Sequence, residues 1–375
     1  MALPTKTQIS DAVENSSNIL DPQLAGFCPI SGIFGAEMYC GGFCIVYPLK
    51  NAQGKKYAFR VWHQEIDGIK DRIKKISDYL HQINIPYFVE FDFVENALRV
   101  PDAYNGDQQI DAIRMDWVSG DNLMKYLNSI IIGNLSDAEK KAKIQDLAAK
   151  FKEMVIILHE KRISHGDLQH GNIIVTPQQE LKLVDYDSVY VPTFIDEVQV
   201  TSGLVGYQHP CRKGNNKIAT EKDDYFSEYV IYTSLLAYAE DLSLWEVLDD
   251  EDHPRDEYSL LFKEADFQSP TQSALFTKLR QSQNQDITEL VDILIRVLQE
   301  PDCKNLQPLE TIFPAKQKYL EQSGAKAIDK SFLSQLVKEN NRPTYTTPTI
   351  NIEYDEEEKR KRYSQNYGII FKNTN

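Results

Sequence analysis

The spacing of apolar residues changes once along this chain of 375 residues, and the change limits the folds that it can adopt. Over residues 27–118, short apolar runs alternate with polar residues, as in 56–62, which is the pattern of strands. Beyond Gly120 the apolar residues recur at helical spacing, as over 144–158, after a capping-box sequence. A mainly β half followed by a mainly α half predicts an α+β fold with two lobes and a cleft between them.

Low apolar density at both ends sets the expected domain bounds. Residues 1–26 are polar and are expected to form an arm, and residues 322–375 a tail. An acidic run followed by a basic run at 355–362 predicts a solvated helix with ion pairs four residues apart, or a docking segment. The expected folded domain is 27–321, with an antiparallel-β lobe at 27–114, a hinge at 115–120 and a helical lobe at 121–321.

The charge and the cysteines argue against several classes of protein. Asp and Glu total 56 against 41 Lys and Arg, a net charge of −15, which disfavours binding to nucleic acid or to anionic membranes. No run reaches about 18 apolar residues and the first residues do not resemble a signal peptide, so neither a membrane span nor secretion is expected. The five cysteines lack the spacing of a disulfide framework or a zinc site, and we expect reduced thiols in a cytoplasmic protein.

One segment carries most of the chemistry. Residues 163–175 follow a long helical pattern and precede a predicted hairpin, and they place Asp167 and Asn172 five positions apart on a loop. Asp185 follows at the end of the second hairpin strand. Phosphoryl transfer from ATP needs a carboxylate that orients the acceptor hydroxyl and takes its proton, and oxygen ligands for the Mg²⁺ ions that bridge the phosphates. These three side chains can supply those groups.

The segment resembles the catalytic loop of the protein-kinase superfamily, in which His-x-Asp is followed by Asn five positions on. Asp185, Tyr186 and Asp187 stand where kinases have Asp-Phe-Gly. The resemblance implies a bilobed kinase-like fold with ATP and Mg²⁺ as cofactors. It also implies that Asp167 is the catalytic base and that Asn172 and Asp185 are Mg²⁺ ligands. Asp187 occupies the usual glycine position; assistance to a second metal is one alternative there, and a solvated or capping residue is the one that we expect.

The expected hinge resembles the segment that joins the two lobes of a kinase. Met115 is then the gatekeeper beside the nucleotide, and the backbone of Asp116 and Val118 binds adenine. Asp121 is placed to reach the ribose, although it is an equally good helix N-cap. With these landmarks the resemblance covers about residues 30–315.

The groups expected near the phosphates depart from the kinase pattern. Gly41 and Gly42 end a Gly-rich stretch that is either a phosphate-covering loop or a plain turn. Arg60 stands where kinases have a strand lysine, and its guanidinium is longer, planar and bidentate. We assign Arg60 to the catalytic and ATP-binding residues, where it either clamps phosphate or places ATP poorly. Its acidic partner is expected on the next helix, as Asp71 or Asp78.

Four further positions differ from the usual kinase residues. Gln169 replaces a lysine, and Leu204 replaces a threonine that normally contacts the catalytic aspartate. Gly166 replaces the arginine that binds phosphate on the activation segment, so activation by phosphorylation there is not expected. Cys211 replaces a glutamate, and residues 303–305 lack the arginine with which that glutamate usually pairs.

The particular strings narrow the resemblance. The resemblance is to bacterial kinase-like proteins of tellurium-resistance and stress gene clusters, and it rests on four short motifs at 114–118, 165–172, 185–187 and 207–210. Such kinases are often encoded beside a metal-dependent protein phosphatase and a von Willebrand A-domain protein. The resemblance therefore implies these two partners besides a protein substrate.

Three functions remain open at this point. The first is phosphorylation of protein Ser/Thr hydroxyls in bacterial stress or defence signalling. The second is a small-molecule kinase of the aminoglycoside or choline phosphotransferase type, whose loop and metal motif are similar. The third is a pseudokinase, a nucleotide-binding interaction module, which Arg60, Gln169 and Leu204 favour. Asp224 follows Asp185 by 39 positions, and the intervening segment ends like an activation segment, which favours the first.

Overall fold

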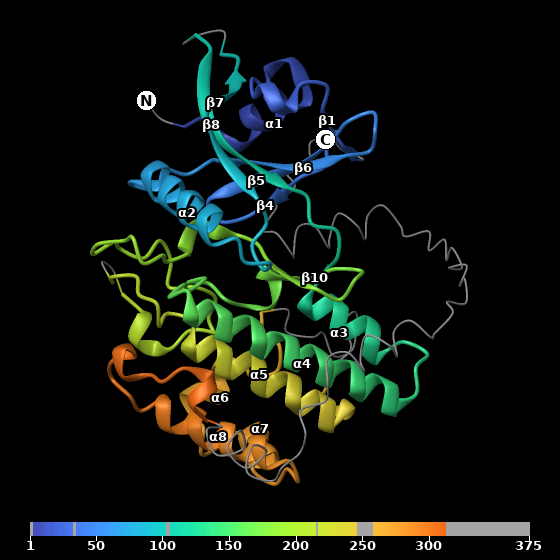
Figure 1. Ribbon diagram of the computed structural model, residues 1–375, viewed down its shortest axis with the longest axis vertical. Helices are drawn as coiled ribbons and strands as arrows, with labels where there is room; N and C mark the ends of the chain where they lie inside the picture. Colours follow the sequence, from blue (N-terminus) through green and yellow to red (C-terminus); the bar gives the residue numbers. More distant parts are fainter. Residues whose placement is uncertain (1–2, 33–34, 103–105, 215–216, 246–257, 313–375) are drawn as a thin grey trace, which may run out of the picture. The chain divides into compact units, whose positions relative to one another are not determined.

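The predicted change from strands to helices is confirmed by the computed structural model of the chain (Figure 1). The structure describes residues 3–32, 35–102, 106–214, 217–245 and 258–312. Residues 1–309 form one compact unit and residues 310–375 a second, of which only 310–312 are described. The helix predicted at 355–362 lies outside the described residues.

Antiparallel strands build the N-terminal lobe. Within the described residues they form a sheet in the order β1-β5-β6-β8-β7, with β4 also paired to β5, and β2 pairs separately with β3. The bounds are β1 Cys28–Pro29, β2 Ser31–Gly32, β3 Gly35–Ala36, β4 Tyr39–Cys40, β5 Cys44–Lys50, β6 Lys56–Trp62, β7 Phe91–Val100 and β8 Gln108–Asp116. The predicted hairpin turn joins β5 to β6, where the Gly54 N–H donates to the Asn51 carbonyl at 3.0 Å.

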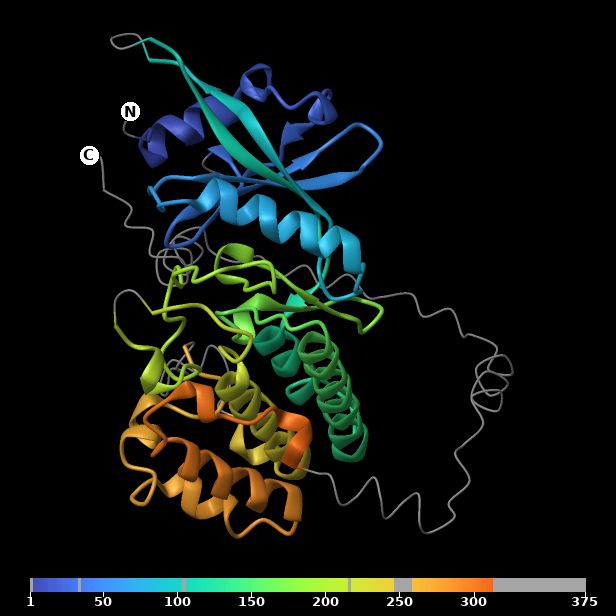
Figure 2. The ribbon, with the colours of Figure 1, turned by 60° about the vertical axis from the view of Figure 1, so that its left-hand side comes forward.

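Helix α2, Ile69–Ile83, is the second layer of this lobe. It packs against β7, on the side of the sheet that faces the helical lobe (Figure 2). Its apolar stripe completely buries Ile73 and Ile76. Arg72 lies on the same buried stripe, so a cation points from this helix into the molecule.

The first residues do not form the expected polar arm. Residues Lys6–Glu14 form helix α1, which begins with a capping box between Thr5 and Gln8 and packs against β7. Ile9 and Val13 are completely buried. A stripe this short is hard to recognise in a polar stretch, because it spans little more than two turns. The segment therefore belongs to the N-terminal lobe.

Helix α5 is the core of the C-terminal lobe. Nearly all of its residues are buried, and it packs against both α4 and α8 (Figure 1). The bounds are α3 Leu123–Ile131, α4 Asp137–Glu160, α5 Tyr225–Glu240, α6 Glu264–Gln268, α7 Ala274–Leu279 and α8 Gln285–Val297. The predicted capping box of α4 is present between Ser136 and Glu139. Among the helices that the structure describes, none has the length and apolar character needed to cross a membrane.

A small sheet in the C-terminal lobe frames the chemically important loop. The predicted hairpin is formed by β10 Ile173–Val175 and β11 Leu181–Leu183, and β9 Asp121–Asn122 pairs with the other edge of β10. The Leu183 N–H donates to the carbonyl of Tyr87 at 2.7 Å. This bond fixes the hairpin to the segment that leads into β7.

Candidate active site

The loop between α4 and β10 is braced by the residue that precedes α5. The Asp224 carboxylate accepts the backbone N–H groups of His165 and Gly166, the latter at 2.9 Å. The buried His165 ring donates from Nε2 to the Val184 carbonyl at 2.8 Å. Burial raises the pKa of Asp224. These contacts fix the backbone immediately before Asp167.

Gly166 is required by its surroundings. Its φ of +77° lies in the left-handed region, which disfavours side chains with a Cβ. A Cβ at this position would overlap the carbonyl oxygen of Ser188 and lie 3.0 Å from the carbonyl carbon. The arginine found here in typical kinases therefore does not fit this backbone.

Asp167 is held in one orientation by two neighbours. Its Oδ1 accepts the backbone N–H of Leu204 at 2.9 Å, and Asn172 Nδ2 donates to its carbonyl at 2.8 Å. Leu204 thus makes through its backbone the contact that its side chain lacks. Burial raises the pKa of Asp167, and the nearby Asp185 carboxylate raises it further. A carboxylate with a raised pKa is a stronger proton acceptor.

Asn172 and Asp185 offer oxygen atoms that fit Mg²⁺. Asn172 uses Nδ2 toward Asp167, so its Oδ1 is the atom available as a ligand. Asp185 has a φ of +71° and a side chain that is 48% exposed, and it bonds Arg60 through Oδ1 alone. Amide and carboxylate oxygens are the ligands that hard divalent cations prefer, so this donor set suits the ion.

Arg60 on β6 reaches the metal motif directly. Its Nη2 donates to Asp185 Oδ1 and to Asp187 Oδ2, each at 2.6 Å, and its Nε donates to Cys44 Sγ at 2.8 Å. Burial opposes the charge of Arg60, but the Asp187 and Asp185 carboxylates raise its pKa well above the ordinary value. Burial raises the pKa of the Cys44 thiol to about 12, so that group stays protonated.

The expectation of an acidic partner on α2 is wrong. Asp71 and Asp78 are both exposed, whereas Asp187 is 5% exposed and pairs with Arg60. The prediction that Asp187 is solvated or capping is therefore wrong as well. Helix α2 contributes Arg72 instead, whose Nε donates to the Asp187 carbonyl at 2.8 Å.

Arg72 makes further bonds to the segment after the metal motif. Its Nη2 donates to the carbonyls of Ser188, at 3.4 Å, and Val189, at 3.1 Å, and its Nη1 to that of Val198, at 3.2 Å. Sequence reasoning missed this residue. A signal was present, because a cation on the buried stripe of α2 requires acceptors.

The hinge residues occupy the end of β8 and the link to α3. Met115 is buried, and the N–H of Asp116 already donates to the Glu90 carbonyl at 3.0 Å. Val118 is partly exposed. Asp121 is exposed, and it does not cap α3 because the N-cap of that helix is the next residue.

The true N-cap of α3 is Asn122, whose side chain accepts the Lys125 N–H at 2.9 Å. The N-cap alternative for Asp121 is therefore wrong, and its exposed carboxylate stays available to a ligand. In the Gly-rich stretch, Gly41 and Gly42 form the turn between β4 and β5, where the Gly41 N–H donates to the Cys44 carbonyl at 2.8 Å.

Two cysteines are not the expected free thiols. Cys211 and Cys303 form a disulfide across 92 residues, whereas Cys28, Cys40 and Cys44 are free. The prediction failed because spacing along the chain carries no information on a pair brought together by the fold. The positions that lack the usual ion pair are thus joined by a covalent bond.

The lobes and the site define a class, that of the kinase-like phosphotransferases. Residues 36–342 match the family model of the protein kinase domain, and the chain belongs to that family. A segment of 82 residues is 28% identical to the EKC/KEOPS complex subunit BUD32 of Gibberella zeae. That segment covers 22% of this chain and 31% of the relative, so the chain spans about a third of the relative's length.

Proposed function

We propose that the chain transfers the terminal phosphoryl group of ATP, with Mg²⁺, to Ser/Thr hydroxyls of a protein. The observation that carries the proposal is the arrangement of Asp167, whose carboxylate is oriented by the Leu204 N–H while Asn172 holds its backbone. Asp167 orients the acceptor hydroxyl and takes its proton as the new P–O bond forms and ADP leaves. Bound Mg²⁺ would neutralise charge on the phosphates, and Asn172 and Asp185 are the residues that would hold it.

Arg60 supports nucleotide binding as well as metal placement. Its Nη1 is buried and has no hydrogen-bond partner within the described part of the chain. A phosphate oxygen would satisfy that donor, and guanidinium groups bind phosphate strongly. The same residue orients Asp185 through Nη2, so phosphate and metal ligand are positioned together.

The surface beside Asp167 suits a polypeptide acceptor. Val205 follows the residue that bonds Asp167, and it is 46% exposed. An apolar side chain exposed next to the residue that bonds Asp167 favours a polypeptide acceptor over a small polar molecule.

The proposed cellular role is supported only by the short sequence motifs that resemble the bacterial kinase-like proteins. We propose a cytoplasmic bacterial kinase of the tellurium-resistance type, acting in stress or defence signalling with a metal-dependent phosphatase and a von Willebrand A-domain protein. The expected end of the kinase domain at residue 321 lies outside the described residues, and the family match extends to residue 342. With α1 packed on the sheet, the domain starts before residue 27.

A labelling experiment tests the proposed reaction. The full chain with Mg²⁺ and radiolabelled ATP should label itself or a partner protein. Asp167→Asn should abolish labelling and keep the thermal stabilisation by ATP, whereas Asp78→Asn, an exposed control on α2, should change neither. Labelling that survives in Asp167→Asn contradicts the catalytic assignment, and stabilisation without labelling in the unchanged chain indicates a pseudokinase.

A further inference from the structure

The end of the segment that follows Asp185 is covalently tied to the last part of the helical lobe. Cys211 lies in the 3-10 turn η5, Pro210–Arg212, and Cys303 begins the turn η7, Cys303–Asn305. Their Cα atoms are 5.9 Å apart, a separation that suits a disulfide. Both residues are partly exposed, so a dissolved reductant can reach the bond.

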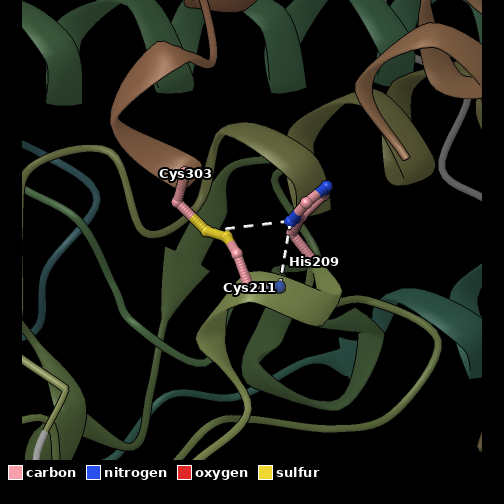
Figure 3. Close-up of side chains that lie close together, drawn as sticks. All are labelled: His209, Cys211 and Cys303. Atoms are coloured by element: carbon pink, nitrogen blue, oxygen red, sulfur yellow. Dashed lines mark hydrogen bonds between the residues drawn. A yellow bond between two sulfur atoms is a disulfide. The ribbon is translucent and has the colours of Figure 1, made fainter. Parts of the chain in front are cut away.

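His209 braces the same place from a third direction (Figure 3). Its Nδ1 accepts the backbone N–H of Cys211 at 3.1 Å, which leaves the ring proton on Nε2. Nε2 donates to the carbonyl of Val297, the last residue of α8, at 2.7 Å. Nδ1 also lies 3.8 Å from Cys303 Sγ. The disulfide and the imidazole together fix η5 against the C-terminal part of the lobe.

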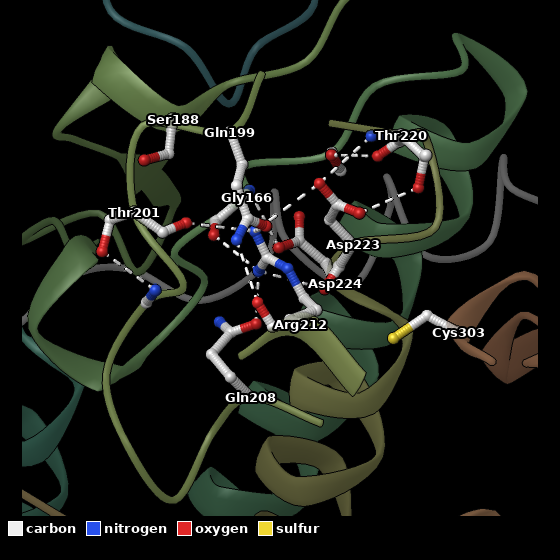
Figure 4. Close-up of polar contacts among 12 residues, drawn as sticks. Gly166, Ser188, Gln199, Thr201, Gln208, Arg212, Thr220, Asp223, Asp224 and Cys303 are labelled. Carbon is white, nitrogen blue, oxygen red and sulfur yellow. Dashed lines mark hydrogen bonds and ion pairs between the residues drawn. The ribbon is translucent and has the colours of Figure 1, made fainter. Parts of the chain in front are cut away.

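Arg212 connects this fixed point to the catalytic loop (Figure 4). It follows Cys211 directly in the chain and is 3% exposed. Its Nη1 donates to the carbonyl of Gly166 at 2.7 Å, and Gly166 is the residue before Asp167. The disulfide is therefore one residue away from a guanidinium that holds the backbone of the proposed base.

The same guanidinium also holds other parts of the segment. It bonds the side chain of Gln208, and its Nη2 lies 3.3 Å from Gln199 Oε1 and 3.5 Å from an Asp223 carboxylate oxygen. Buried donors of a charged group are costly to leave unpaired. A shift of η5 would therefore break several contacts at once rather than one.

We propose that Cys211 and Cys303 form a thiol–disulfide switch that acts on the catalytic loop through Arg212. The proposal rests on the proposed kinase function. The closed bond holds Arg212 on the Gly166 carbonyl and keeps the loop in the arrangement described above. Reduction frees η5, loosens that contact and slows phosphoryl transfer.

The chemistry requires a dithiol reductant. One thiolate of the reductant attacks one sulfur of the bond, and the other cysteine leaves as a thiolate that takes up a proton. The second thiol of the reductant then displaces the remaining cysteine from the mixed disulfide. The protein gains two electrons and two protons as two thiols, and the reductant leaves as its own disulfide.

The side chains of His209, Cys211 and Cys303 are also a set of residues that could bind a metal ion. Two thiolates and an imidazole are also ligands of Zn²⁺. The ligand atoms of His209, Cys211 and Cys303 lie within 4.8 Å of one another, and bonded sulfurs offer no thiolate. The structure thus favours the disulfide, and retained zinc is an outcome that overturns the switch.

The first test does not depend on kinase activity. The full chain is equilibrated with oxidised glutathione or with dithiothreitol, its free thiols are alkylated, and its peptides are mapped without reduction. The oxidised sample should contain a peptide pair joined through Cys211 and Cys303, with the other three cysteines alkylated. Amide exchange over 203–214 should accelerate on reduction. Absence of the joined pair, stoichiometric zinc, or unchanged exchange overturns the proposal.

The second test measures the rate of phosphoryl transfer. Reduction should lower the rate by about fivefold or more, the usual lower range of a coupling between sites. Cys303→Ser should be equally slow with and without reductant, whereas Cys28→Ser, which removes an exposed free thiol, should respond like the unchanged chain. Equal rates in both redox states contradict the switch. A chain that transfers no phosphate in either state contradicts the proposed function, while mapping and exchange still decide on the switch.

Discussion

Replacing Gly166 by alanine tests the closest backbone approach in the candidate active site. At a φ of +77° alanine costs about 1 kcal/mol more than glycine. Its Cβ would also overlap the Ser188 carbonyl oxygen, which Arg72 holds in place from α2. Displacing packed backbone adds about 2 kcal/mol, as overpacking generally does. We therefore expect Gly166→Ala to lower the free energy of unfolding by about 3 kcal/mol.

Two matched variants separate these contributions. Gly26 has a φ of +82° with no atom near its Cβ position, so Gly26→Ala should cost about 1 kcal/mol from the backbone alone. Gly42 has neither feature, and Gly42→Ala should change stability by less than about 0.5 kcal/mol. Urea unfolding followed by tryptophan fluorescence measures all three. If Gly166→Ala costs no more than Gly26→Ala, the argument from overlap is refuted.

Three further outcomes follow from the Arg60 cluster and from α2. Arg60→Lys should lower kcat/KM for ATP by about tenfold, because one ammonium cannot contact Asp185, Asp187 and Cys44 together. Steady-state kinetics measure this ratio, and an equal or higher value in the variant contradicts the prediction. Arg72→Gln should destabilise the chain by about 2 kcal/mol in urea unfolding, because buried carbonyls lose their donor; an unchanged midpoint rejects it. Burial raises the pKa of Asp187 to about 6, so the folded chain binds a proton there more tightly than the unfolded chain does. The free energy of unfolding therefore includes a contribution from this proton that is complete below about pH 4 and is lost as the pH rises through about 6. Relative to Asp187→Asn, the unchanged chain should lose about 3 kcal/mol of stability between about pH 4 and pH 7, and parallel pH curves would count against this.

The parts of the fold that sequence reasoning predicted depend on local patterns. The strands of the first half, the capped helix α4 and the hairpin of β10 and β11 all follow from spacing within one element. Asp167, Asn172 and Asp185 were selected because phosphoryl transfer needs those groups on a rigid loop, and their roles stay predictions; the structure does bring Asn172 into contact with Asp167. These features require no knowledge of distant contacts.

The contacts of Arg60 could not be predicted in the same way. The resemblance to kinases placed its partner on the next helix, but Asp187 lies 127 positions away and reaches Arg60 only because the lobes meet. The disulfide is a similar case, since Cys211 and Cys303 are 92 residues apart. For Asp121, the error was a single residue at a helix start, where Asn122 offers the same capping chemistry.

The anchoring of α2 has a consequence for inhibitor chemistry. Arg72 donates to four carbonyl oxygens of the segment that begins at Asp187, so these hydrogen bonds tie helix α2 to that segment. A compound that wedges α2 away from the sheet must leave these buried carbonyls without a donor, at about 1 kcal/mol or more for each. Compounds that leave Arg72 in place avoid that loss. Selective ligands for this chain are therefore best designed to contact the partly exposed Asp185 carboxylate and the Arg60 guanidinium bonded to it, and to leave Arg72 in place.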